Sequence, residues 1–335
     1  MLISGLFLIF LAGLFQGTWA LGIKKSEPFS WESIWAPFSL IGMVIIPVIC
    51  TSIVIPDFID VFRSVEINVL LKPFIYGALW GVGAVTFGLA IRYIGMSLSY
   101  GINMGVASAV GSLIPFFMLG NLSGKLIFFI LAGTAVMIQG IVIVTVAGIM
   151  REKLQNADSG EIVKKGATRK GVIFSLIGGF ATAAFNIGFS ETKPLTDIAI
   201  TNGASAANAS LLAWILILSG GFLVNFGFAL FLIFRNRSYK DYKAKGASKA
   251  LLKTAATAAM WFAAIGIYGQ GAAIMGSLGP VVGWIMFMAL ALIVSNLWGL
   301  RTGEWKDLVK PKKYLLAGNV ILILSWIILG LANSF

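Results

Sequence analysis

Histidine is absent from the 335 residues of the chain, and cysteine occurs once, as Cys50. Without histidine, an imidazole base and histidine-based metal binding are both excluded. A single cysteine cannot form an internal disulfide, and in an apolar run it usually behaves as a small core residue. Paired carboxylates, metal-ligand spacings and glycine-rich phosphate loops are not found either. We therefore expect no enzyme activity, no catalytic residues, no metal and no cofactor.

Charged residues are also scarce, at 11% of the chain, where a soluble domain has roughly 25%. Apolar residues make up 59%, and the mean hydropathy is +0.94. The net charge of +12 could suggest a nucleic-acid partner, but the basic residues lie in short loops between apolar runs. Cytoplasmic loops of membrane proteins hold lysine and arginine in this way. We therefore expect the lipid bilayer as a partner, and no nucleic acid.

Ten apolar runs follow one another along the chain, each close to the length that a bilayer-crossing helix needs, about 20 residues. The longest polar loops, 150–170 and 235–250, are too short to hold a soluble core. The joins near residues 94 and 272 are very short, and the first predicts a tight turn at 92–95. The sequence predicts an all-α polytopic membrane protein with ten transmembrane helices, at residues 2–23, 35–55, 71–92, 96–119, 125–149, 171–190, 208–234, 251–270, 274–299 and 314–333.

The basic residues divide unevenly between the two sides of this predicted bundle. Of the 25 lysines and arginines, all but four lie in odd-numbered loops, the four being Arg63, Lys72, Lys125 and Lys193. Cytoplasmic loops carry an excess of lysine and arginine. We therefore expect the odd-numbered loops to face the cytoplasm and both termini to lie outside it.

The chain contains two internal matches. At an offset of 181 residues, the Leu-Leu-Lys tripeptide at 70–72 recurs at 251–253, and Trp80 falls on Trp261. At an offset of 166 residues, three glycines of the first predicted helix, Gly5, Gly13 and Gly22, fall on Gly171, Gly179 and Gly188. Glycine and tryptophan can recur by chance in apolar sequence, but two separate ungapped matches favour a duplication.

A duplication of five helices has a topological consequence. Because five is an odd number, the second copy enters the membrane upside down. We expect two inverted five-helix repeats, residues 1–160 and 161–335. Inverted repeats of this kind place a binding site near the bilayer midplane and allow alternating access.

Uncharged polar and aromatic side chains inside the predicted helices are the candidates for ligand contact. Amides and hydroxyls can pair with the hydroxyls of a neutral polyhydroxylated ligand, and aromatic faces can cover its apolar C–H surface. The alternative for each is a hydrogen bond that only joins helices. The candidates are Gln16, Trp19, Trp80, Thr86, Tyr100, Asn103, Asn186, Trp261, Tyr268 and Gln270.

Other residues of the same types have simpler explanations. Trp31, Trp35 and Trp305 occupy positions typical of interfacial belt residues. Asn225 and Asn296 are expected to bond neighbouring helices. Charge inside the predicted spans is nearly absent, and a charged substrate would normally need a buried counter-charge, so a neutral substrate is favoured.

One stretch of the chain resembles a known family. The run from Tyr76 to Ser97 (YGALWGVGAVTFGLAIRYIGMS) is similar to the L-rhamnose–proton symporter family of the drug/metabolite transporter superfamily. Shorter matches extend the similarity over nearly the full length, at Lys24-Lys25 with Ser30-Trp31-Glu32, Lys193-Pro194, Met260-Trp261 and Glu304-Trp305. The resemblance implies ten helices in two inverted halves, and proton-coupled sugar uptake across the inner membrane.

The chain departs from the family pattern at several positions of the expected site. Ala84 stands where the family has a polar amide, Phe87 where it has a tyrosine, and the region of Ala263 and Ala264 is less polar. Losing a hydroxyl or amide partner changes which sugar hydroxyls can be satisfied. The departures therefore bear on which sugar is carried.

Together these patterns predict a secondary active transporter that imports a neutral monosaccharide, L-rhamnose or a related sugar, with a proton. Of the 13 acidic residues, all but Glu191 lie in evident loops or flanks, so Glu191 is the candidate for proton coupling. An interfacial glutamate near Lys193 is the alternative role. For the whole chain, the alternatives are an exporter or facilitator of another small metabolite of the same superfamily, and a membrane protein without a transport role.

Overall fold

The computed structural model of the chain describes residues 2–23, 26–120, 123–156 and 165–332. Within these residues it contains helices and turns and no strand. Ten helical segments are long and apolar enough to cross a membrane. The predicted all-α fold with ten transmembrane helices is thus confirmed.

The crossings follow the chain in order. The first five are α1 (Leu2–Thr18) with a 3₁₀ turn at Trp19–Gly22, α2 (Trp31–Leu40) continued by a π-turn at Ile41–Ile45 into α3 (Ile46–Val54), α5 (Ile67–Ile94), α6 (Met96–Met118) and α7 (Gly124–Asn156). The last five are α8 (Lys165–Glu191), α10 (Ala206–Asn236), α11 (Ala247–Ile274), α12 (Trp284–Arg301) and α13 (Val309–Ala332). Between them lie α4 (Phe58–Arg63), α9 (Lys193–Thr201), a 3₁₀ segment η3 (Ser238–Lys243), a 3₁₀ turn at Gly276–Leu278 and a π-turn η5 (Gly279–Gly283).

Some helices begin earlier than the sequence predicts. The second crossing starts at Trp31 instead of 35, and α5 starts at Ile67 instead of 71. Polar residues such as Glu32 and Asn68 belong to these extra turns. An apolar run marks the hydrocarbon region, whereas a helix can continue through the polar interface on either side. The expected ranges therefore fell inside the observed ones at these ends.

The tight turn predicted at 92–95 joins α5 to α6. Gly95 has a φ of +78°, a conformation that residues with a Cβ rarely adopt. The carboxylate of Glu152, in α7, accepts a hydrogen bond of 2.8 Å from the backbone N–H of Ser97 in the first turn of α6. That donor would otherwise lack a partner at a helix start, so α7 fixes the angle at which α6 leaves the turn.

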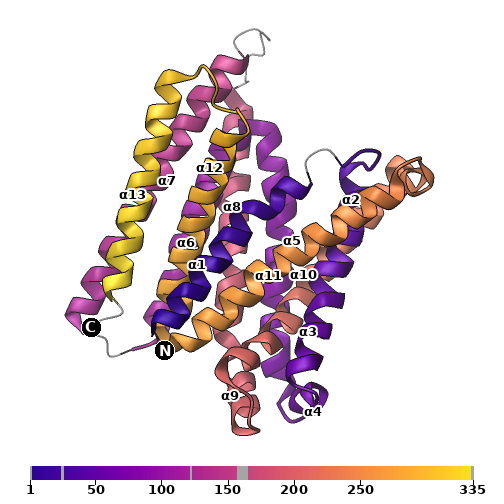
Figure 1. Ribbon diagram of the computed structural model, residues 1–335, viewed down its shortest axis with the longest axis vertical. Coiled ribbons are helices and arrows are strands. Elements are labelled where there is room, and N and C mark those ends of the chain that lie inside the picture. Colours follow the sequence, from indigo (N-terminus) through magenta and orange to yellow (C-terminus); the bar gives the residue numbers. More distant parts are fainter. Residues whose placement is uncertain (1, 24–25, 121–122, 157–164, 333–335) are drawn as a thin grey trace.

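Long helix pairs build the bundle. Helix α5 packs along α8, α1 along α11, and α7 along α13. Helix α6 also contacts α8, and α12 contacts α1. Figure 1 shows the start of α1 and the end of α13 at the same end of the molecule, as an even number of crossings requires.

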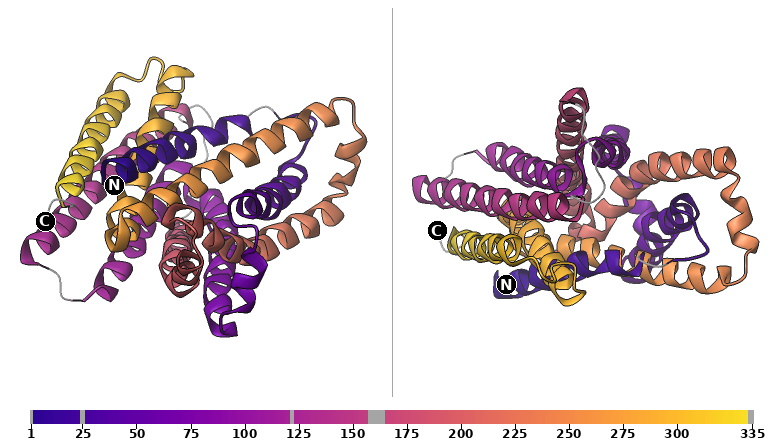
Figure 2. Two further views of the ribbon diagram at one scale, coloured as in Figure 1. Left: turned by 60° about the horizontal axis from the view of Figure 1, so that its bottom comes forward. Right: turned by 90° about the horizontal axis from the view of Figure 1, so that it is seen from above.

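The second crossing lies inside a ring formed by later parts of the chain. Figure 2 shows α10, η3 and α11 passing around α2, and all three contact it. The largest buried cluster includes Phe185, Trp214, Tyr268 and Phe287, from α8, α10, α11 and α12. Phe185 and Phe287 of this cluster also line the cavity described below.

Helices α5 and α10 approach most closely at two glycines. A methyl group at Gly77 would lie 1.8 Å from the carbonyl oxygen of Ile217, and one at Gly220 would lie 1.9 Å from that of Phe74. Small residues at such contacts allow helix backbones in a membrane to pack directly. No flexible side chain can move aside here, because the opposing atoms are backbone.

We predict that Gly77→Ala lowers the thermal unfolding midpoint of the detergent-solubilised protein by several degrees, because the methyl group forces α5 and α10 apart. Overpacking of this kind costs about 1–3 kcal/mol. The matched control is Gly227→Ala, at an exposed position of α10 where an added methyl meets nothing within 4 Å. It should leave the midpoint unchanged or raise it slightly, since alanine has a higher helix propensity than glycine. Equal midpoints for the two variants would contradict the contact.

Candidate functional site

A cavity of about 980 Å³ lies in the middle of the bundle, and we call it the central cavity. Its lining in α5, α7 and α10 extends to Arg92, Arg151 and Arg235, near the ends of these helices. These ends lie away from the start of α1 and the end of α13, as Figure 1 shows. Arg92 and Arg235 are exposed, so the cavity opens at that end of the bundle.

Two stacked tryptophans form the centre of the cavity wall. The rings of Trp80 in α5 and Trp261 in α11 have centroids 5.9 Å apart and planes only 12° from parallel. The ring centroid of Trp80 also lies 4.7 Å from that of Phe185, and the ring centroid of Trp261 lies 5.5 Å from that of Phe38. The two tryptophans matched at an offset of 181 in the sequence therefore meet in space. Offset stacking of this kind is favourable between aromatic rings.

Two side-chain amide atoms in the cavity have no hydrogen-bond partner among the described residues. They are Oε1 of Gln16, an acceptor in α1, and Nδ2 of Asn103, a donor in α6. Asn103 is 2% exposed, and Gly178 of α8 leaves room for it, since a methyl there would lie 2.7 Å from Nδ2. An unpaired buried polar group costs about 1–3 kcal/mol. An acceptor and a donor left open in one cavity are suited to a ligand that carries hydroxyl groups.

Other predicted residues divide between the cavity and its surroundings. Trp19 and Tyr100 line the cavity together with the residues above. Thr86 and Gln270 do not line it, and the hydroxyl of Thr86 donates to backbone carbonyls of its own helix, at 3.0 Å to Gly83. Glu191 is also outside the cavity, at the far end of α8, with its Oε2 3.8 Å from Nζ of Lys72.

Asn186 and Tyr268 lie one layer beyond the cavity, on its closed side. Nδ2 of Asn186 donates to the carbonyl oxygens of Gly111 at 2.8 Å and of Pro280 at 2.7 Å, and its Oδ1 accepts from the hydroxyl of Tyr268. Both side chains are fully buried. The two residues predicted as ligand contacts are, in this conformation, bonded to the protein itself.

The π-turn η5 supplies acceptors to this layer, because a π-turn departs from regular α-helical bonding. Besides the carbonyl of Pro280, that of Val281 accepts a bond of 2.9 Å from the hydroxyl of Ser112 in α6. We call these four bonds, three of Asn186 and one of Ser112, the Asn186 knot. It fastens α6, α8, α11 and η5 together on the side where both chain ends lie.

Charged residues gather at the open mouth, where the sequence predicted no ion pair. Arg151 at the end of α7 forms an ion pair of 3.1 Å with Glu304, and its guanidinium lies 4.7 Å from the ring centre of Trp305. Trp305 was expected in an interfacial belt but is 6% exposed under this arginine. The partners are 153 residues apart, and an acid in a short loop gives no signal of such a contact in the sequence.

Two further expectations concern α2 and α12. Trp35, expected in the interfacial belt, lines the cavity, and its indole N–H donates 3.0 Å to Oδ1 of Asn225. Asn296 donates 2.7 Å to Oδ1 of Asn319, which confirms a bond between α12 and α13. Asn225 therefore joins helices as predicted and also lines the cavity.

The start of α2 is tied to η3 beside the mouth. Oδ2 of Asp241 accepts bonds of 2.9 Å from the backbone N–H of Ser30 and from the hydroxyl of Ser33. Burial alone would raise the pKa of Asp241, but hydrogen bonds from Ser30 and Ser33 outweigh it and hold that pKa below its usual value. Asp241 is therefore a stable anion that holds α2 inside the ring formed by α10, η3 and α11.

Comparisons with known proteins cover almost the whole chain. The family model described as L-rhamnose-proton symport protein matches residues 2–334. An L-rhamnose-proton symporter of Cronobacter sakazakii (strain ATCC BAA-894) is 29% identical over 327 residues, which cover 93% of this chain and 92% of the relative. Proteins of the same name from Klebsiella pneumoniae (strain 342) and Yersinia pestis (strain Pestoides F) are each 28% identical, with the same shares covered. The chain therefore belongs to the L-rhamnose-proton symport protein family.

Proposed function

We propose that this chain imports a neutral monosaccharide, L-rhamnose or a closely related sugar, together with a proton. The relatives that match it over nine-tenths of their length are named as L-rhamnose-proton symporters. The observation that carries the proposal is the central cavity, in which a stacked tryptophan pair lies with an unpaired amide acceptor and an unpaired amide donor.

The chemistry of the cavity fits a sugar. A sugar ring presents C–H groups that pack on aromatic faces, and hydroxyls that both donate and accept. In the proposed complex, one hydroxyl donates to Oε1 of Gln16 and another accepts from Nδ2 of Asn103. The charged lining residues of the described chain lie at the mouth, at Arg92, Arg151, Arg235 and Glu304. The inner part of the cavity is therefore uncharged, which favours a neutral substrate.

Within this proposal, the sugar contacts come from Gln16, Trp19, Trp80, Tyr100, Asn103 and Trp261. Asn186 and Tyr268 act one layer below, as the closed outer side of the pathway. Thr86 and Gln270 lie outside the cavity, and we assign them no sugar contact in this conformation.

Alternating access between residues 1–160 and 161–335 is the proposed mechanism. The cavity opens at the end where Arg151, Arg235 and Arg301 lie, which the distribution of basic residues assigns to the cytoplasm. The conformation is then open to the inside, with the Asn186 knot closing the outside. Both termini would lie outside the cytoplasm and the protein in the inner membrane.

Orientation can be tested with cysteines in a Cys50→Ala background. Ser248, at the start of α11, and Asn202, between α9 and α10, are both exposed. In intact cells, a membrane-impermeant maleimide should label the protein carrying Asn202→Cys, and should label the one carrying Ser248→Cys only after permeabilisation. The reverse pattern would overturn the proposed orientation. Ser159, an obvious second position, lies outside the described residues.

Sugar contact by the two unpaired amides can be tested without disturbing the fold. Asn103→Ala and Gln16→Met each remove a group that has no partner in the protein, so the thermal midpoint should not fall. The concentration of L-rhamnose needed for half-maximal uptake into proteoliposomes should rise about threefold to tenfold, because each variant loses one hydrogen bond to the sugar. Asn208→Ala, in the first turn of α10 and outside the cavity, is the control. Unchanged half-saturation in both variants would place the sugar elsewhere.

Proton coupling is proposed to involve Glu191. Its side chain is 20% exposed on the closed side of the bundle, and a proton would remove its attraction to Lys72. Glu191→Gln should abolish accumulation of sugar driven by an imposed pH gradient while exchange of labelled sugar survives. Asp197→Asn is the control, since Asp197 is an exposed acid nearby that pairs with Lys193. Normal accumulation by Glu191→Gln would exclude this role, and no accumulation by the unmodified protein would favour a facilitator.

A further inference from the structure

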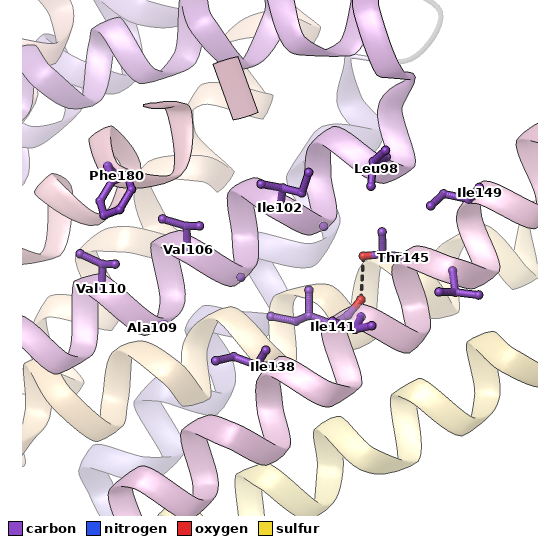
Figure 3. A pocket seen from close by; sticks show the side chains of 14 residues that line it. Leu98, Ile102, Val106, Ala109, Val110, Ile138, Ile141, Thr145, Ile149 and Phe180 are labelled. Atoms are coloured by element: carbon purple, nitrogen blue, oxygen red, sulfur yellow. Dashed lines mark hydrogen bonds between the residues drawn. The ribbon is translucent and has the colours of Figure 1, made fainter. Parts of the chain in front are cut away.

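A second hollow of about 510 Å³ lies between α6 and α7 on the outside of the bundle, and we call it the lateral groove. Figure 3 shows its apolar side chains, which α6, α7 and Phe180 of α8 supply. Thr145 is the one polar residue in the lining, and its hydroxyl already donates 2.7 Å to the carbonyl of Ile141. The groove therefore offers nothing to a sugar.

The groove faces the lipid. Val142 is 54% exposed and Phe180 58% exposed, and both are large apolar side chains on helices that cross the membrane. The groove is thus continuous with the lipid-facing surface of α6, α7 and α8. Hydrocarbon chains are what a bilayer presents to such a surface.

The inner wall of the groove is thin. Gly101, Ile141 and Thr145 line both the lateral groove and the central cavity. A methyl group at Gly101 would lie 1.8 Å from Oγ1 of Thr145, so α6 and α7 touch there without space between them. These three residues therefore lie between the proposed sugar cavity and the lateral groove.

A positively charged residue, Lys153, lies beyond one end of the groove. Val142, Val146 and Ile149 line the groove at helical spacing, and Lys153 follows Ile149 by one turn on the same face of α7. Lys153 is exposed in the last turn of the helix. The neighbouring Glu152 is bonded to the start of α6 instead. A lysine at the end of a membrane helix can extend toward the level of the lipid headgroups.

We propose that the lateral groove binds one anionic phospholipid, with an acyl chain between α6 and α7 and the phosphate beside Lys153. The hydrophobic effect does not select this lipid, because its chain leaves an equally apolar environment. Selection comes from the fit of the chain into the groove and from the charge of Lys153 near the headgroup. The bound chain covers the thin wall at Gly101 and Thr145 from the lipid side.

The experiment uses the full chain in nanodiscs that contain phosphatidylglycerol with a photoreactive diazirine in one acyl chain. After irradiation and digestion, labelled residues should concentrate at 98–110 and 138–149. Labelling spread evenly over the lipid-facing helices would mean ordinary surrounding lipid and would overturn the proposal. Labelling of the other lipid-facing helices with none at 98–110 and 138–149 would also overturn it, since something other than lipid would then cover the groove.

Two variants test the two ends of the lipid separately. At Gly105 an added Cβ meets nothing within 4 Å, so Gly105→Leu should fill the groove and reduce its labelling at least fivefold. Gly227→Leu, at an equally open site of α10, should leave it unchanged. In the unmodified protein, phosphatidylglycerol should label the groove severalfold more than phosphatidylcholine does. Lys153→Gln should remove this preference. Because Lys153 is on the surface, the substitution should not affect folding. Full labelling of the groove in Gly105→Leu, or an unchanged lipid preference in Lys153→Gln, would contradict the site.

Failure of this proposal is distinguishable from failure of the proposed function. Gly105 does not line the central cavity, so leucine there leaves the cavity lining unchanged. Sugar uptake by Gly105→Leu should therefore match that of the unmodified protein while the groove label is lost. A loss of uptake together with unchanged labelling would contradict the groove assignment and leave the sugar site untouched.

Discussion

Inside a bilayer, a polar group that does not pair within the protein has no solvent to replace its partner. Several buried polar side chains of this chain meet that condition by bonding to the backbone of their own helix, as Thr134 and Thr254 do. Other buried polar atoms without a partner among the described residues, such as Oγ of Ser175 and Nδ2 of Asn319, lie outside the central cavity. Gln16 and Asn103 differ from these because they leave an acceptor and a donor open in the same cavity. The proposed sugar site is thus a cavity in which the protein leaves hydrogen bonds to a ligand.

Close helix contact and irregular turns arrange the rest of the pathway around that site. At the crossing of α5 and α10, Gly221 leaves room for the ring of Trp80, since a methyl there would lie 2.7 Å from it, and Trp80 stacks on Trp261. The π-turn η5 turns backbone carbonyls toward α6 and α8, where Ser112 and Asn186 bond them. The same elements therefore shape the cavity and close one end of it. A substitution at such a contact would affect fold and transport together.

The sequence was informative where a local pattern carries the physics. Apolar runs of sufficient length located all ten crossings, and Gly95 located the turn between α5 and α6. Residue type also led to Gln16, Asn103 and the tryptophan pair. It could not distinguish these from Asn186 and Tyr268, which bond each other, because the partner of an amide is decided by packing between helices far apart in sequence. The ion pair of Arg151 and Glu304 gave no local signal for the same reason.

The two ends of the proposed pathway are held by different chemistry, and the balance between them decides whether transport can occur. In the proposed mechanism, opening the outer side would break the Asn186 knot, whose four hydrogen bonds contribute on the order of 4 kcal/mol at about 1 kcal/mol each. In the proposed complex, a sugar that pairs with two amide groups and covers an aromatic face gains a comparable amount. A ligand shifts a conformational equilibrium only by its difference in affinity between the two states. In this mechanism, a knot much stronger than that difference would hold the chain in its present state, and a much weaker one would leave the outer side open for part of the time without sugar.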